Sequence, residues 1–136
     1  MSQEAVIKSS QGARSLELSA PLRLKEELQQ FTVTIRAEGL TASRDVYAFE
    51  GEERLLALFD EMAAEWRGWE GTKEWASLEG ELTVAVTHDR VGTVTLRAAL
   101  WHYEQLEWRA AIELTVDAGE QLTEAAAAIR RFVHAA

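Results

Sequence analysis

The stretch LEWRAAIELTVDAGEQLTEAAAAIRRFVHAA, Leu106–Ala136, changes its hydrophobic period once, and that change decides the fold class. Up to Val116, apolar and polar residues alternate, as in a half-buried β-strand whose successive side chains point to opposite faces. Beyond Gly119, apolar residues recur at the spacing of one helix face: Leu122, Ala125, Ile129 and Phe132. The segment therefore predicts a strand followed by a helix near residues 118–134.

The ends of this helix carry their own signals. Asp117 lies three residues before Glu120, the spacing of a capping box, in which the two side chains satisfy backbone N–H groups of the first turn. Arg130, Arg131 and His134 fall near the other end, where the helix dipole favours cations. Both signals strengthen the prediction of a helix.

The same change of period occurs earlier in the chain. QFTVTIRAEG, residues 30–39, alternates like a strand, whereas EERLLALFDEMAAEW, residues 52–66, has helical spacing. We expect a helix near residues 51–67, ended by Gly68, with Trp66 as its last core residue. Further strands are predicted in four stretches: RSLELSA, SRDVYAFE, SLEGELTVAVTHD and TVTLRAALW.

Every connection between the predicted strands is short, which favours antiparallel hairpins. We therefore expect a single α+β domain over residues 1–136, with two layers. One layer is a mostly antiparallel sheet of six or seven strands, and the other is formed by two helices packed on one face of that sheet. TVTIRA at 32–37 and TVTLRA at 93–98 agree at five of six positions. A duplicated βββα unit is one interpretation, and chance agreement among strand-favouring residues is the other.

Charge is spread unevenly over the 136 residues, whose net charge is −9. Residues 50–81 hold ten acids and three bases, a net −7. Nucleic-acid binding needs a basic footprint, which this chain lacks, so no nucleic-acid partner is expected. The acidic segment indicates either a basic protein partner or simply a surface that favours solubility.

Two further absences bear on location. No apolar run approaches the roughly 20 residues of a membrane span, so no membrane partner is expected. The chain has no cysteine, which fits a reducing compartment. We expect a cytoplasmic protein and leave its oligomeric state open.

Catalytic and metal-binding signals are weak. The three histidines, His88, His102 and His134, form no H-x-x-x-H pair, so no metal, cofactor or catalytic residue is predicted. THDRVG, residues 87–92, is typical of a turn, although a His-Asp pair could also orient a general base. Glu79 and Glu81 are predicted to lie on the solvent face of a strand.

The tryptophans supply the strongest candidate site. EWRGWEGTKEW, Glu65–Trp75, contains three of the five tryptophans, and its glycines predict a loop. Trp66 and Trp108 are expected in the core. Trp69 and Trp75 either fold back as a lid or form a contact surface, since tryptophan is enriched at binding hot spots. We expect Trp69 to be exposed and Trp75 to be the more buried.

The candidate binding surface joins this loop to the THDRVG turn. Its acids would favour a basic ligand. Its members are Trp69, Glu70, Lys73, Glu74, Trp75, His88, Asp89 and Arg90.

The run from Trp66 to Gly92 resembles the central segment of a small bacterial family of unknown function. The shared pattern is W-x-G-x-K-x-W-x-S-L-E followed by a strand that ends in T-H-D-R. The matching residues are Trp69, Gly71, Lys73, Trp75, Ser77, Leu78, Glu79, Thr87, His88, Asp89, Arg90 and Gly92. The resemblance implies a bacterial cytoplasmic protein and no particular activity, because the family has none assigned.

Two hypotheses of function follow. The first is a non-enzymatic protein-interaction module, immunity-protein-like or regulatory, that binds a basic partner. The alternative is a small-molecule-binding domain or enzyme whose pocket lies between the sheet and the helices, near Trp69, Lys73, Trp75 and His88.

Overall fold

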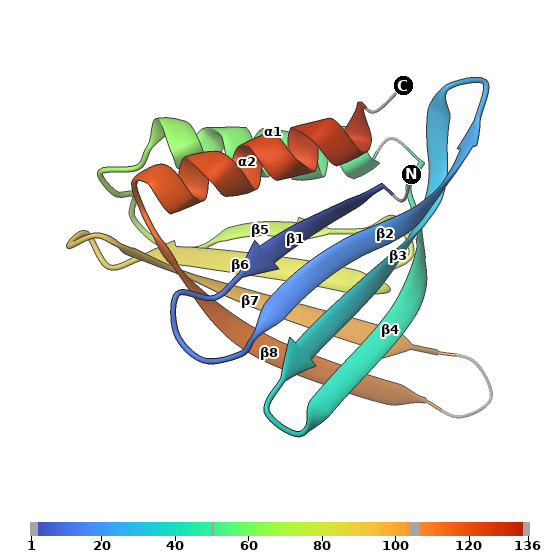
Figure 1. Cartoon of the computed structure of the whole chain (residues 1–136), viewed down its shortest axis with the longest axis horizontal. Coiled ribbons are helices and arrows are strands. Elements are labelled where there is room, and N and C mark those ends of the chain that lie inside the picture. The colour runs from blue at the N-terminus through green and yellow to red at the C-terminus, as the bar shows by residue number, and fades with distance from the viewer. Residues whose placement is uncertain (1–2, 50, 104–106, 135–136) are drawn as a thin grey trace.

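A computed structural model describes residues 3–49, 51–103 and 107–134. In these residues each half of the chain forms four strands and then a helix (Figure 1). The first half contains β1 (Glu4–Lys8), β2 (Ser15–Leu24), β3 (Glu27–Ala37), β4 (Leu40–Tyr47) and α1 (Gly51–Ala64). The second half contains β5 (Lys73–Ala76), β6 (Leu82–His88), β7 (Thr93–His102), β8 (Trp108–Asp117) and α2 (Glu120–Val133).

The strands form two antiparallel sheets, a first sheet in the order β1-β2-β3-β4 and a second in the order β5-β6-β7-β8. The α+β class and the antiparallel pairing are confirmed, but the expected single sheet of six or seven strands is wrong. The two unpredicted strands are β1, with five residues, and β5, with four. Such short strands carry too few alternating positions to be recognised. Helix α1 lies between β4 and β5 in the chain, and these two strands are edge strands of different sheets.

The inner faces of the two sheets and the apolar faces of both helices enclose one core. In Figure 1 the strands of the first sheet cross those of the second, and the helices lie side by side along one end of the pair. The predicted alternation is confirmed in β3, β6 and β7, whose inward residues are almost fully buried: Phe31, Val33, Ile35, Leu82, Val84, Val86, Val94, Leu96, Ala98 and Leu100. Leu106 of the predicted last strand lies outside the described residues.

The repeated order of elements extends the sequence match. TVTIRA lies in β3 and TVTLRA in β7, and these are the third strands of their respective halves. The repeating unit contains four strands and a helix, so the expected βββα unit was one strand too short.

Both helices differ from the prediction at their ends. α1 ends at Ala64, so Trp66 lies beyond it and is 49% exposed; the prediction that Trp66 belongs to the core is wrong. α2 begins after Gly119, which makes no side-chain cap. The expected capping box is also wrong, because Asp117 still belongs to β8 and its N–H donates to the side chain of Gln121. Neither described helix is long and apolar enough to cross a membrane.

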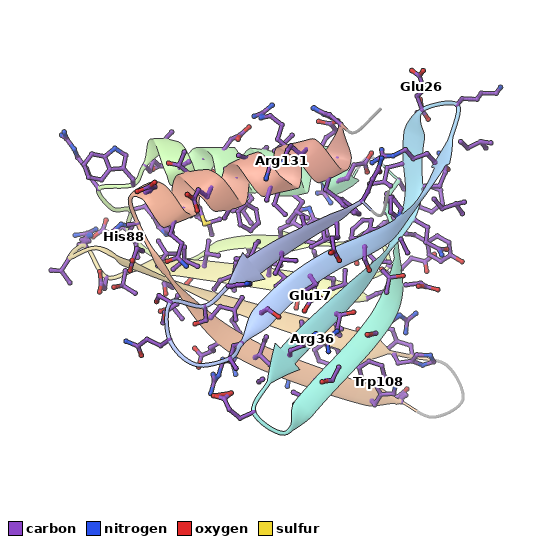
Figure 2. The ribbon with its side chains drawn as sticks, viewed as in Figure 1. Glu17, Glu26, Arg36, His88, Trp108 and Arg131 are labelled. Carbon is purple, nitrogen blue, oxygen red and sulfur yellow. The ribbon has the colours of Figure 1, made fainter. Side chains whose placement is uncertain are left out.

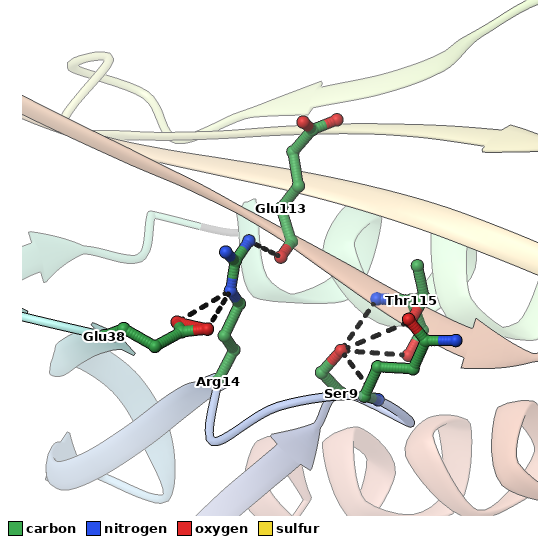
Figure 3. A network of polar contacts seen from close by, with 6 residues as sticks. Ser9, Arg14, Glu38, Glu113 and Thr115 are labelled. Atoms are coloured by element: carbon green, nitrogen blue, oxygen red, sulfur yellow. Dashed lines mark hydrogen bonds and ion pairs between the residues drawn. The ribbon is translucent and has the colours of Figure 1, made fainter.

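The β1–β2 loop closes part of the open edge of β8 (Figure 3). Ser10 N–H donates to the carbonyl of Thr115 at 2.7 Å, and Thr115 N–H donates to Ser9 Oγ at 3.0 Å. Arg14 donates to the carbonyl of Glu113 at 3.2 Å and forms an ion pair with Glu38. The loop thus joins the two sheets and satisfies backbone groups that an edge strand would otherwise present to other chains.

The β2–β3 hairpin turns through Lys25 and Glu26, which both have positive φ, 54° and 71°. This geometry favours Asn-Gly, and a left-handed residue with a Cβ costs about 1 kcal/mol or more. Lys25→Asn combined with Glu26→Gly is therefore expected to raise the free energy of unfolding by about 1–2 kcal/mol, as measured by urea denaturation. Gly39, at φ 74° with open space around it, supplies the control. Gly39→Ala should destabilise, and a loss of stability in the hairpin variant would contradict the assignment of strain.

Candidate functional site

The tryptophan loop folds back onto the core. Trp69 and Trp75 are each only 7% exposed. Trp75 points inward from β5, where its Nε1 donates to the carbonyl of Gly51 at 3.0 Å. Trp75 was expected to be the more buried and Trp69 to be exposed; both expectations are wrong, because the two indoles are equally buried. The lid alternative describes this loop correctly, so neither indole can serve as an exposed hot spot.

Trp69 is enclosed by two of the other predicted site residues. The ring of His88 meets it edge-on, with centroids 5.0 Å apart, and Lys73 Nζ lies 5.2 Å from its centroid. His88 itself is fixed on both sides. Its Nδ1 accepts from Arg90 N–H at 2.7 Å, and its Nε2 lies 2.7 Å from the carbonyl of Trp66. Because a backbone N–H can only donate, Nδ1 is the acceptor, and Nε2 carries the proton that it donates to that carbonyl. Both ring nitrogens are therefore engaged in fixing the loop.

Lys73 joins β5 to the end of α1. Its Nζ lies 2.8 Å from Glu61 and 2.9 Å from Glu65. The hydrogen bond from Lys73 lowers the pKa of Glu61 below its ordinary 4.5, and the same bond raises the pKa of Lys73 above 10.5, with a smaller contribution from Glu65. The ammonium group of Lys73, which the sequence suggested for binding a partner, is thus paired with carboxylates of the same protein.

Lys73→Gln is expected to lower the free energy of unfolding by about 1 kcal/mol near neutral pH, the scale of a small surface ion network. The stabilisation by Glu61 is lost as the pH falls through its lowered pKa, and that by Lys73 as the pH rises through its raised pKa. The difference between variant and wild type should therefore shrink below about pH 4. Urea unfolding near pH 7 and near pH 3.5 measures it. An equal difference at both values would show that packing, and not the ion pairs, is responsible.

The THDRVG stretch forms a turn, which is the first of the two interpretations that its sequence allowed. Asp89 accepts from the N–H groups of Val91 at 2.8 Å and Thr93 at 2.9 Å. These two bonds, the one from Thr93 first, lower the pKa of Asp89. The carboxylate oxygen of Asp89 lies 4.0 Å from His88 Nδ1, and this nitrogen already accepts a hydrogen bond from Arg90 N–H. The arrangement holds a turn and does not orient a general base. Arg90 extends outward and lies 3.5 Å from Glu70.

Glu81, which was expected on a solvent face, is only 1% exposed. It accepts from Ser77 Oγ at 2.6 Å and from the backbone N–H of Tyr47, in the first sheet, at 3.0 Å. The prediction fails because Ser77–Gly80 forms a turn, with Gly80 at φ 75°, so the alternation does not continue through it. Gly80 was the one visible signal. Glu81 joins the two sheets at the end of β4.

Comparison with known families addresses the whole chain at once. The model of a family of unknown function, DUF6228, matches residues 7–136. The chain belongs to this family. The expectation of a family of unknown function is thereby confirmed, and its bacterial and cytoplasmic character stays a prediction. No match was found among curated proteins or among solved structures.

In this DUF6228 chain most acids of the acidic segment have partners inside the molecule. Besides the two acids held by Lys73, three more form ion pairs: Glu53 with His134, Asp60 with Arg130, and Glu70 with Arg90. Lys73 is already counted in the net −7 of residues 50–81, so Arg90 and Arg130 lower the excess of acids only to five, and part of the segment stays acidic. Within residues 3–49, 51–103 and 107–134, no three His, Asp or Glu side chains are placed to hold a metal ion.

Two acids of this segment, Glu52 and Glu53, line a groove of about 1000 Å³ together with two acids from elsewhere in the DUF6228 chain. This acidic groove lies between the β2–β3 hairpin, the first turn of α1 and the end of α2. Its lining includes Glu26, Glu27, Glu52, Glu53 and one arginine, a formal charge of −3 from four acids and one base. Two acids come from a part of the sequence with balanced charge, so a count along the chain could not find the site. Figure 2 shows Glu26 at the tip of the hairpin.

Exposed apolar side chains adjoin the acidic groove. Phe49 lines it and is 56% exposed, and its ring lies 5.8 Å from that of Tyr47. Leu22 and Leu24 on the same hairpin are also exposed. The pairing of Leu22 with Gln30, and of Gln30 with Tyr47, places Leu22 and Tyr47 in one row across the first sheet with Gln30 between them, and Leu24 follows Leu22 on β2. We call Leu22, Leu24, Tyr47 and Phe49 the apolar patch.

Proposed function

We propose that this protein is a non-enzymatic protein-interaction module, regulatory or immunity-protein-like, that binds a basic partner segment at the acidic groove. The observation that carries the proposal is the exposed ring of Phe49 between an acidic groove and the rest of the apolar patch. Contiguous exposed apolar surface marks interaction sites, and the surrounding charge selects the partner and speeds its approach.

The acids of the hairpin are the ones best placed to meet such a partner. In the described structure neither Glu26 nor Glu27 has an ion-pair partner, and both are exposed. Arg23, the base in the groove, donates from both terminal nitrogens, to the carbonyls of Phe132 and Val133 at the end of α2 and to Gln3, so its guanidinium is held within the protein. A Lys- or Arg-containing segment with one or two large apolar residues would satisfy both features of the site.

The test compares partner capture by two charge-matched double variants. Wild type should retain a protein with a basic segment from lysate at low salt and release it as salt rises. Glu26→Gln with Glu27→Gln should lose that protein. Glu79→Gln with Glu124→Gln, which removes the same charge from exposed positions elsewhere, should keep it. Equal retention by both variants would contradict the proposal.

The strained hairpin adds a sharper variant. Lys25→Asn with Glu26→Gly should raise stability while it weakens capture, because the change relieves the turn and removes an acid that lines the groove; the base lost with it, Lys25, is not in the lining. If capture were lost because the variant unfolds, its free energy of unfolding would fall instead of rise. The measurement of stability therefore distinguishes unfolding from loss of the acid.

Two earlier predictions remain beside this proposal. The exposed members of the first candidate surface, Glu70, Glu74, Asp89 and Arg90, stay a predicted contact region without the two indoles. The alternative of a small-molecule site also stays a prediction, although the surroundings of Trp69 and His88 are filled by side chains.

A further inference from the structure

A second groove, of about 970 Å³, crosses the outer face of the second sheet beside α1. Its lining includes four bases and two acids, Arg54, Lys73, Arg97, Arg109, Glu61 and Glu74, which give a formal charge of +2. The whole chain carries −9, so this basic groove is a local exception to the charge of the protein. It is separate from the acidic groove, with which it shares no lining residue.

Small side chains form the floor of the basic groove. Ala76, Thr83 and Ala99 line the groove, and the strand register places them in one row across β5, β6 and β7 that Ala111 continues on β8. On one side of this row lies Arg97, and on the other lie Trp101 and Arg109. Larger side chains therefore flank a shallow trough that runs across the strands. Ala99 is only 5% exposed, because the trough is narrow at that point.

The two flanking arginines are available for a ligand. Arg97 is exposed and has no ion-pair partner within the described structure. Arg109 is exposed and stacks over Trp101, with its guanidinium carbon 4.6 Å from the ring centroid, which leaves its N–H donors free to bind outward. Lys73 is held by Glu61 and Glu65, and Arg54 donates to the carbonyl of Ala76. The arginines of β7 and β8 thus define where an anion would sit.

We propose that the basic groove binds an extended acidic peptide segment, with two consecutive Asp or Glu residues on Arg97 and Arg109. Four strands spaced about 4.8 Å apart span roughly 14 Å, the length of about four extended residues. Successive side chains of such a segment point to opposite walls, which matches arginines on opposite sides of the row and on adjacent strands. Arginine binds carboxylates bidentately, and the small floor admits a peptide backbone.

Charge and shape favour a peptide over nucleic acid. A long nucleic acid would meet the net −9 of the chain beyond the groove. A short acidic segment needs only the local +2. This site lies outside the proposed function, which concerns a basic partner and a different groove.

The experiment measures fluorescence polarisation of a labelled peptide, Gly-Ala-Asp-Glu-Ala-Gly, on the full chain at low salt. Arg97→Gln and Arg109→Gln should each weaken binding by at least about fivefold, the loss expected for one charged hydrogen-bonded contact. Ala99→Leu fills the floor without a change in charge and should weaken binding by a similar factor. Thermal unfolding of each variant checks that the fold is kept.

Four controls decide the outcome. Arg131→Gln removes an equal charge from the exposed face of α2 (Figure 2) and should leave the affinity unchanged. The Asn-Gln version of the peptide should not bind, and an oligothymidylate should bind no better than that version. Glu27→Gln should have no effect, so failure here is distinct from failure of the proposed function. Full affinity in Ala99→Leu, an equal loss in Arg131→Gln, or preferred binding of the oligonucleotide would each overturn the proposal.

Discussion

Trp75→Ala is expected to lower the free energy of unfolding by about 3–5 kcal/mol, the usual cost of removing a large aromatic side chain from a core. Trp75 is 7% exposed, packs against Gly51 and donates from Nε1 to the carbonyl of the same residue. Its loss would open a cavity where β5 meets the start of α1. Trp69→Ala should cost a comparable amount, because Trp69 is equally buried.

Trp66→Ala is the matched control for Trp75→Ala. Trp66 lies past the end of α1, half exposed, with Arg67 stacked 5.0 Å from its ring centroid. Its removal should cost about 1 kcal/mol or less. Urea unfolding of the three variants, followed by circular dichroism, measures the contrast. Equal losses for Trp66 and Trp75 would mean that the loop is not folded onto the core as described.

Glu81→Ala is expected to cost about 2–4 kcal/mol. The change leaves Tyr47 N–H and Ser77 Oγ–H without an acceptor inside the protein, and each unsatisfied buried group costs about 1–3 kcal/mol. It also removes a direct connection between the two sheets. The stability of Glu81→Gln should lie between that of wild type and that of Glu81→Ala, since an amide offers one acceptor oxygen in place of two.

Glu79 provides the control for Glu81, because it lies two residues away in the same turn and is exposed. Glu79→Ala should change stability by no more than about 0.5 kcal/mol. Thermal or urea unfolding of the four proteins measures the series. A loss in Glu81→Ala no larger than in Glu79→Ala would show that the carboxylate does not join the sheets.

Periodicity identified most of the fold because it reports which face of an element is buried. β3, β6, β7 and α2 have enough alternating or helical positions for that pattern to stand out. It could not show the division into two sheets, because the period of a strand does not reveal which strand it pairs with. It also placed Trp66 and Trp108 in the core by extending a pattern beyond the point where its burial ends; Trp108 is 37% exposed.

The candidate site was harder to predict, since it depends on pairing between distant residues. Lys73, Arg130 and His134 lie beside several carboxylates of the acidic segment, so the sequence overstates how much of its charge is open to a partner. The acidic groove joins Glu26 and Glu27 to the first turn of α1, about 25 residues later in the sequence. Only the folded backbone brings these acids together. Burial of Trp69 likewise depends on the loop folding back, which its glycines permit but do not specify.

The most direct test of the proposed function is a map of where a basic segment touches the protein. The measurement is chemical-shift perturbation of the ¹⁵N-labelled protein during titration with an unlabelled peptide, Gly-Lys-Leu-Arg-Phe-Lys-Gly, at low salt. We predict that shifts concentrate at the hairpin tip near Glu26 and Glu27, at Phe49 and in the first turn of α1, and that they vanish in Glu26→Gln with Glu27→Gln. Shifts centred on residues 69–75 and 88–90, or spread evenly over exposed carboxylates, would contradict the account.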